Sequence, residues 1–218
     1  GYGLWLDNTT ADTGPDRVSM RRIRTANGVN GWYYGSHCYL IQAHDCYTSC
    51  TTGNCVYLPS TALVAGENLA FYGHTFDNEG NENTGLQLNF QADVYCYSCS
   101  FDFLARGVQV DASTSTRIQL NCYGCHFEFN KSQSNWSSSS CYLRIGSGSG
   151  APQAINLFGG LVQQDSGGSG TQLPYVFDAG QTGVSAPHGI TLDRVQRSLQ
   201  SGTALSNPSQ TGRFLDNQ

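Results

Sequence analysis

Charged residues are scarce in this chain: only 12% of its 218 residues are Asp, Glu, Lys or Arg, and lysine occurs once, at Lys131. The single basic cluster is short and consists of Arg17, Arg21, Arg22 and Arg24. Proteins that bind nucleic acids usually present a clustered basic face, whereas this chain has a net charge of −5. We therefore expect no nucleic-acid partner.

Long apolar runs are also missing. No stretch approaches the ~20 consecutive apolar residues of a membrane-spanning helix, so we expect no membrane insertion. The first residue is glycine, not methionine, and no signal peptide is visible. We expect the chain to be a fragment or a processed piece of a longer protein.

A complete disulfide framework is excluded, because nine cysteines cannot all pair within one chain. Several of them stand where the repeat described below requires a small buried residue, which is typical of a free thiol. This pattern predicts folding in a reducing cytoplasm.

The sequence does contain one phrase written three times. Residues 69–77 read LAFYGHTFD, residues 94–102 read VYCYSCSFD and residues 120–128 read LNCYGCHFE. A period of 25 to 26 residues is typical of a solenoid. Weaker copies lie at 154–163 and at 39–47, where Leu40 and Thr48 would take the first and last positions.

Strand alternation divides the phrase into inward and outward columns. Phe71, Cys96 and Cys122 share an inward column with apolar neighbours. Two outward columns are predicted: Tyr72, Tyr97, Tyr123 and then Phe158, and Asp77, Asp102, Glu128 and then Gln163.

Short strands, turns rich in Gly and Asn, and the lack of a long helix predict an all-β chain. The period favours a right-handed parallel β-helix of about seven to eight coils over a sandwich, whose strands would not repeat in phase. We expect one domain over residues 1–200 and an irregular tail over 201–218. Residues 190–199 remain ambiguous, because Leu192, Val195 and Leu199 also fit one helical face.

The carboxylate column is the candidate catalytic site. Carboxylates stacked about 4.8 Å apart repel one another, and such crowding raises the pKa of one of them, as cleavage of a glycosidic bond requires. Asp102 and Glu128, about 5 Å apart, would have the retaining separation, and Asp77 and Glu128, about 9–10 Å apart, lie near the upper end of the inverting range. The alternative is that all three are solvated acids of the outer face.

Outward tyrosines offer flat apolar faces with a polar rim, which suits sugar rings. Tyr72, Tyr97 and Tyr123 are therefore predicted substrate contacts, unless a neighbouring subunit or a loop buries them. Three further residues complete the predicted binding set: Trp32, Arg106 and His126.

Two cysteine motifs suggest cofactors. Cys96-x-x-Cys99 together with Cys122-x-x-Cys125 resembles a four-cysteine zinc site, and Cys122-x-x-Cys125-His126 matches the c-type haem attachment motif. The repeat explains both more simply, since it places the first cysteine of each pair in an inward column. We expect no metal and no cofactor.

The stretches Gly66-Glu67-Asn68, Cys99-Ser-Phe-Asp102 and Cys125-His-Phe-Glu128 resemble bacteriophage tailspikes of the pectate-lyase-like β-helix group. Residues 28–35, followed by Tyr39-Leu40-Ile41, are also similar, and the resemblance covers about residues 1–165. It implies a homotrimer on the virion tail, assembled in the host cytoplasm, that binds bacterial surface polysaccharide. It also implies cleavage of that capsule or O-antigen by hydrolysis or lyase chemistry.

Two functions follow as hypotheses. The first is a polysaccharide depolymerase in which Glu128 and Asp102 act as acid and as base or nucleophile, with Asp77 as the alternative partner. The second is a non-catalytic receptor-binding or structural segment of a tail fibre or spike. A secreted pectinase fits less well, because cysteines placed in the core do not suit export.

Overall fold

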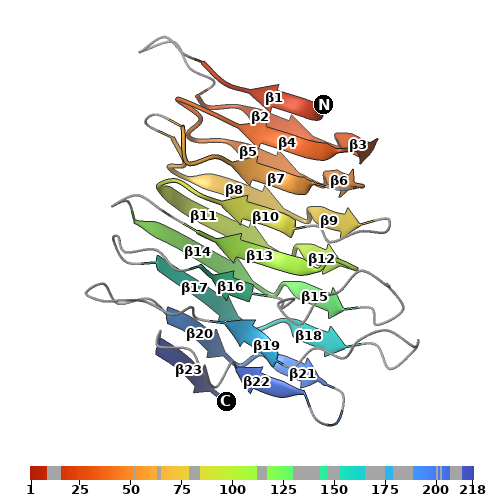
Figure 1. Ribbon diagram of the computed structural model, residues 1–218, viewed down its shortest axis with the longest axis vertical. Helices are drawn as coiled ribbons and strands as arrows, with labels where there is room; N and C mark the ends of the chain where they lie inside the picture. The colour runs from red at the N-terminus through yellow and green to blue at the C-terminus, as the bar shows by residue number, and fades with distance from the viewer. Residues whose placement is uncertain are drawn as a thin grey trace.

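Three parallel sheets wind around one core (Figure 1). The computed structural model describes residues 1–8, 16–51, 53–62, 65–78, 84–111, 117–129, 143–146, 153–164, 175–178, 189–199, 201, 203–206 and 213–218. Within these ranges successive strands join the three sheets in strict rotation, so that each strand pairs with the third strand after it. The chain is therefore a parallel β-helix of about seven to eight coils, as the repeat predicted. None of the described segments is a helix long and apolar enough to cross a membrane.

The sheets are named here in the order in which the chain enters them. Sheet 1 contains β1 (Tyr2–Leu6), β4 (Asn30–Tyr34), β7 (Asn54–Leu58), β10 (Thr84–Leu88), β13 (Arg106–Val110), β16 (Leu143–Ile145), β19 (Tyr175–Asp178) and β22 (Ala204–Ser206). Sheet 2 contains β2 (Ser19–Arg21), β5 (Gln42–His44), β8 (Leu69–Tyr72), β11 (Ala92–Tyr97), β14 (Ile118–Tyr123), β17 (Gln153–Phe158), β20 (Gly189–Asp193) and β23 (Arg213–Asn217). Sheet 3 contains β3 (Arg24–Gly28), β6 (Tyr47–Cys50), β9 (Thr75–Asn78), β12 (Ser100–Asp102), β15 (His126–Phe129), β18 (Leu161–Gln164) and β21 (Gln196–Ser198).

Two expectations need correction at the edges of the repeat, and one ambiguity is resolved. Among the described residues of 201–218, two strands replace the expected irregular tail, because β22 and β23 continue sheets 1 and 2. The ambiguous segment 190–199 forms strands β20 and β21. The weak copy at 39–47 was aligned one residue early: the pairing of Gln42 with Ala70 and of Ser49 with Asp77 places Ile41 and Ser49 in the columns assigned to Leu40 and Thr48.

The turn from sheet 2 to sheet 3 is built around one left-handed residue in each coil. Gly73, Ser98 and Gly124 have φ angles of 58°, 51° and 61°. Glycine adopts this region without the steric cost that a side chain incurs, which explains Gly73 and Gly124, while Arg22, Asp45 and Arg194 take the same conformation in other coils. The next residue points inward, and Cys99 and Cys125 are buried there.

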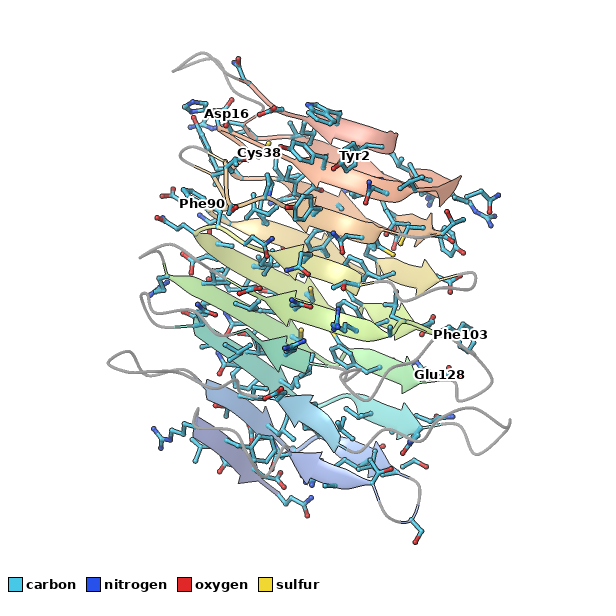
Figure 2. All side chains as sticks on the ribbon, in the orientation of Figure 1. Tyr2, Asp16, Cys38, Phe90, Phe103 and Glu128 are labelled. Carbon is cyan, nitrogen blue, oxygen red and sulfur yellow. The ribbon has the colours of Figure 1, made fainter. Side chains whose placement is uncertain are left out.

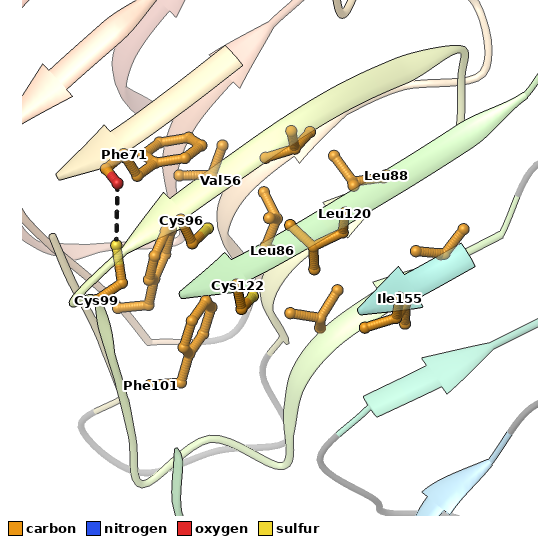
Figure 3. Packing of buried hydrophobic residues seen from close by; sticks show 14 of the residues in the cluster. Val56, Phe71, Leu86, Leu88, Cys96, Cys99, Phe101, Leu120, Cys122 and Ile155 are labelled. Atoms are coloured by element: carbon orange, nitrogen blue, oxygen red, sulfur yellow. Dashed lines mark hydrogen bonds between the residues drawn. The ribbon is translucent and has the colours of Figure 1, made fainter. Parts of the chain in front are cut away.

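The interior is filled by stacked columns of equivalent residues. Phe101 lies between Phe76 and Phe127 with ring centres 4.5 and 4.6 Å away. The eight cysteines within the described residues are all buried, and no disulfide joins them. The Sγ of Cys99 donates to the carbonyl oxygen of Phe71 in the preceding coil, at 3.4 Å (Figure 3). The buried thiols therefore behave as small core residues, and that of Cys99 makes a weak hydrogen bond.

Candidate functional site

The three predicted acids form one column on the outer face of sheet 3. Asp102 pairs in register with Asp77 on β9 and with Glu128 on β15. The phenylalanine that precedes each acid is buried in the core, and alternation therefore turns the acids outward. The predicted register is confirmed, and Glu128 lies at the lateral edge of the molecule in Figure 2.

A second outward column lies two residues before the acids on the same strands. Its Ser100 Oγ donates a 2.6 Å hydrogen bond to Asp102 Oδ1 and lies 3.4 Å from Nδ1 of His126 on the next strand. The same His126 nitrogen is 3.6 Å from Asp102 Oδ1. A ring nitrogen of His126 and one carboxylate oxygen each of Asp102 and Glu128 lie within 4.8 Å of one another. Serine, histidine and two carboxyls thus converge at one place.

The position of Asp102 shifts the pKa of its carboxyl group. Its side chain is only 22% exposed. Burial is the largest cause that raises its pKa, and Asp77 raises it further, while the hydrogen bond from Ser100 and the nearby His126 lower it; the net direction is upward. A raised pKa in the column was predicted, but the cause was not, because burial outweighs the crowding of like charges.

Asp77 is held by the coil before it. Tyr47 Oη donates a 2.5 Å hydrogen bond to Asp77 Oδ2. The guanidinium of Arg24 in turn lies over the Tyr47 ring, 4.7 Å from its centre. Asp77 is thus bonded to the preceding coil and lies two strands from Glu128, so the adjacent Asp102 and Glu128 are the closer pair for an acid and a nucleophile.

The same cluster could hold a cation. Asp102, His126 and Glu128 are the one group of three potential ligands that the described residues bring within 4.8 Å. Two carboxylates and an imidazole would suit a divalent ion such as Mn²⁺ or Zn²⁺. The four cysteines of the zinc-like motif do not form such a group within the same residues, and each is buried in the core.

The aromatic column of sheet 2 lies on the neighbouring face. The rings of Tyr72, Tyr97 and Tyr123 stack with centres 4.9 and 5.1 Å apart. His44 extends the stack at 4.6 Å from Tyr72, and Phe158 extends it at 5.0 Å from Tyr123. Each ring therefore covers the face of the next. The ladder therefore presents ring edges and hydroxyl groups to the outside, and the contact of these tyrosines with sugars stays a prediction.

The other predicted contacts divide between sheets. His126 belongs to the acid cluster. Trp32, on β4 of sheet 1, is completely buried and lies edge-on to His74 at 4.9 Å, so it cannot reach a ligand on the surface. Arg106 begins β13 of sheet 1 and is half-buried; its Nε atom has no hydrogen-bond partner within the described residues.

Sequence reasoning missed two members of the site. Ser100 could have been found by alternation, because it lies two residues before Asp102 and shares its face. Tyr47 was hidden by the one-residue error in aligning the copy at 39–47. With the correct alignment it takes the column of Thr75 and Ser100, next to Asp77.

Comparison of the chain with protein-family models, with curated proteins and with solved structures found no match. The resemblance to tailspikes therefore stays a prediction that depends on the quoted motifs, while the parallel β-helix is established by the pairing of the strands.

Proposed function

We propose that this protein binds and depolymerises bacterial surface polysaccharide at the outer face of sheet 3. One observation carries the proposal: Asp102 and Glu128 lie in register on adjacent strands with carboxylate oxygens within 4.8 Å, and burial raises the pKa of Asp102. A protonated carboxyl beside an ionised one is the pair that glycoside hydrolysis uses. Their closeness fits the retaining arrangement, whose carboxyls are about 5–5.5 Å apart.

The chemistry assigns one role to each carboxyl. Asp102 gives its proton to the glycosidic oxygen as the bond to the anomeric carbon breaks, and the Glu128 carboxylate attacks that carbon to form an ester. Asp102, now ionised, takes a proton from a water molecule that displaces Glu128 and releases the sugar. Ser100 and His126 hold Asp102 in place from the adjacent column.

The biological setting is part of the same proposal. The tailspike-like motifs and the parallel β-helix support a homotrimer on a virion tail, with capsule or O-antigen of the host as the substrate. Molar mass from light scattering tests the assembly: three chains per particle are expected, and a monomer at all concentrations would contradict it.

The catalytic proposal is tested on purified capsule and O-antigen polysaccharides from a panel of bacteria, with release of reducing ends as the readout. Asp102→Asn should lower the rate about 10²–10⁴-fold, the usual contribution of a general acid or base, and Glu128→Gln, which removes the nucleophile, should lower it at least as much. Glu67→Gln, an exposed glutamate in a turn, is the matched control and should cleave normally. Normal cleavage by both site variants would refute the assignment. Fragments one water lighter than hydrolysis products would show a lyase.

A second function is favoured by the hydrogen bonds that Asp77 and Asp102 already make within the chain, because carboxyls with such partners can be structural. In this alternative the protein is a receptor-binding segment without activity. Parent protein that binds a polysaccharide of the panel but releases no ends would favour it.

A further inference from the structure

A column of outward residues runs beside the aromatic ladder on sheet 2. Strand pairing aligns Gln42, Ala70, Tyr95 and Asn121 on successive coils. Lower in the column the side chains touch from coil to coil, since Asn156 Nδ2 donates to Asn121 Oδ1 at 3.0 Å. Ala70 has no side chain beyond Cβ, so the column has a gap, called here the empty rung, where a longer side chain would lie between Gln42 and Tyr95.

A hollow of about 320 Å³ opens at this place. Its lining consists of Leu40, Gln42, Asn68, Ala70, Tyr72, Tyr95 and Tyr97. The volume is at the lower end of ligand pockets, which span ~300–1,000 Å³. The lining contains aromatic rings and amides but no ionisable acid or base other than tyrosine, which suits a neutral and partly apolar guest.

The spacing of the coils determines what fits. Neighbouring strands are about 4.8 Å apart, so Gln42 and Tyr95 stand about 9.6 Å apart across the empty rung. The ladder rings repeat at 4.9 and 5.1 Å, so a flat guest halfway across would lie at stacking distance from Tyr95. Unlike the ladder tyrosines, Tyr95 has no described ring stacked on it, and it lines the hollow next to Ala70.

We propose that this hollow binds one pyranose ring of a neutral saccharide, which fills the rung that Ala70 leaves empty. The ring stacks on Tyr95, and its hydroxyl groups are within the range of the amides of Gln42 and Asn68 and the hydroxyls of Tyr72 and Tyr97. The choice of a sugar as the guest rests on the proposed function, and the site lies on a different sheet from Asp102 and Glu128.

Saturation-transfer NMR with a panel of neutral methyl hexopyranosides, including gluco-, galacto-, manno- and 6-deoxy forms, tests binding directly. The parent protein should give a signal with at least one glycoside. Ala70→Gln, which copies the Gln42 side chain into the empty rung, should weaken binding of that glycoside at least tenfold. Tyr95→Leu removes the stacking face without filling the hollow and should weaken it similarly. Ala154→Gln, an outward alanine on the same sheet in a different column, is the control and should bind normally.

Unchanged binding by both Ala70→Gln and Tyr95→Leu, or no signal from any glycoside with the parent, would overturn the proposal. So would a change in oligomeric state caused by Ala70→Gln alone, since a second copy of the chain would then occupy the hollow. Glu128→Gln separates this site from the catalytic one: it should keep glycoside binding while cleavage is lost. Glycoside binding together with normal cleavage by Glu128→Gln would instead refute the proposed catalysis and leave the hollow standing.

Discussion

Ser100 donates a 2.6 Å hydrogen bond to Asp102, two residues away on the same strand. The bond favours the ionised carboxylate and partly offsets the effect of burial on the pKa of Asp102. The proton-donor role proposed for Asp102 thus depends on a balance in which burial raises its pKa and the Ser100 hydroxyl is the largest opposing cause.

Ser100→Ala should move the titration of Asp102 to higher pH, because the variant removes a bond that lowers its pKa. Carbon-detected NMR of the aspartate carboxyls across the acidic range measures the shift. Ser19→Ala, an exposed serine on sheet 2, is the matched control. A downward shift in Ser100→Ala would show that the hydroxyl does not stabilise the charged form.

Asp102→Asn should change how stability depends on pH. Because the folded-state pKa of Asp102 is raised above its unfolded value of about 4, its contribution to stability is full below that value and is lost as pH rises through the folded pKa. The variant lacks this loss. The difference in Tm between the variant and the parent should therefore rise in favour of the variant as pH increases through the folded pKa, and should be larger at neutral pH than at acidic pH. A difference that falls with rising pH would contradict the burial argument.

His74 should govern the opposite pH window. It is fully buried, and burial lowers its pKa to about 3. The contribution of His74 to folding stability is present above the unfolded-state pKa near 6.5 and is lost as pH falls towards the folded-state pKa. The loss amounts to up to about 2 kcal/mol between pH 6.5 and pH 5.

His74→Cys isolates that contribution, because Cys46, Cys99 and Cys125 occupy the equivalent turn position in other coils. Urea unfolding at pH 5 and pH 7 should show a smaller loss at acidic pH for the variant than for the parent. Equal losses would mean that His74 takes up its proton without unfolding.

The aromatic ladder should stabilise the fold more than single exposed tyrosines do. Tyr97 stacks on Tyr72 and on Tyr123, and each aromatic pair contributes about 0.5–1.5 kcal/mol beyond area burial. Tyr97→Ala should therefore lower the unfolding free energy by about 1–3 kcal/mol, while Tyr97→Phe keeps the stack and should be near neutral. Chemical denaturation measures both; equal effects of the two changes would show that the hydroxyl, and not the stack, matters.

The sequence predicted the fold and the acid column because both follow from a period. Asp102 and Glu128 stand at the same place in two near-identical phrases, and a parallel β-helix can only bring such residues together on adjacent strands. The weak copy at 39–47 was misaligned because it lacks the two residues that identify the phrase. His44 replaces the tyrosine, and Asp45, with a φ of 53°, replaces the glycine.

Trp32 was misplaced for a different reason. It lies on β4, outside the three copies of the phrase, and the inward direction of its side chain follows from pairing with Leu4 and Val56 on the adjacent strands, which the sequence of β4 alone does not reveal. The hollow at Ala70 was equally out of reach, since it arises from three coils together: the small residue matters only because Gln42 and Tyr95 flank it. Both features depend on contacts distant in the chain.

The most direct test of the account measures cleavage and binding on the same sample. Light scattering follows the average molar mass of a polysaccharide that the parent protein degrades, and sedimentation with that polysaccharide reports binding. The account predicts that Glu128→Gln still binds the polymer but leaves its molar mass unchanged over the period in which the parent degrades it. Degradation by Glu128→Gln at the parent rate would contradict it.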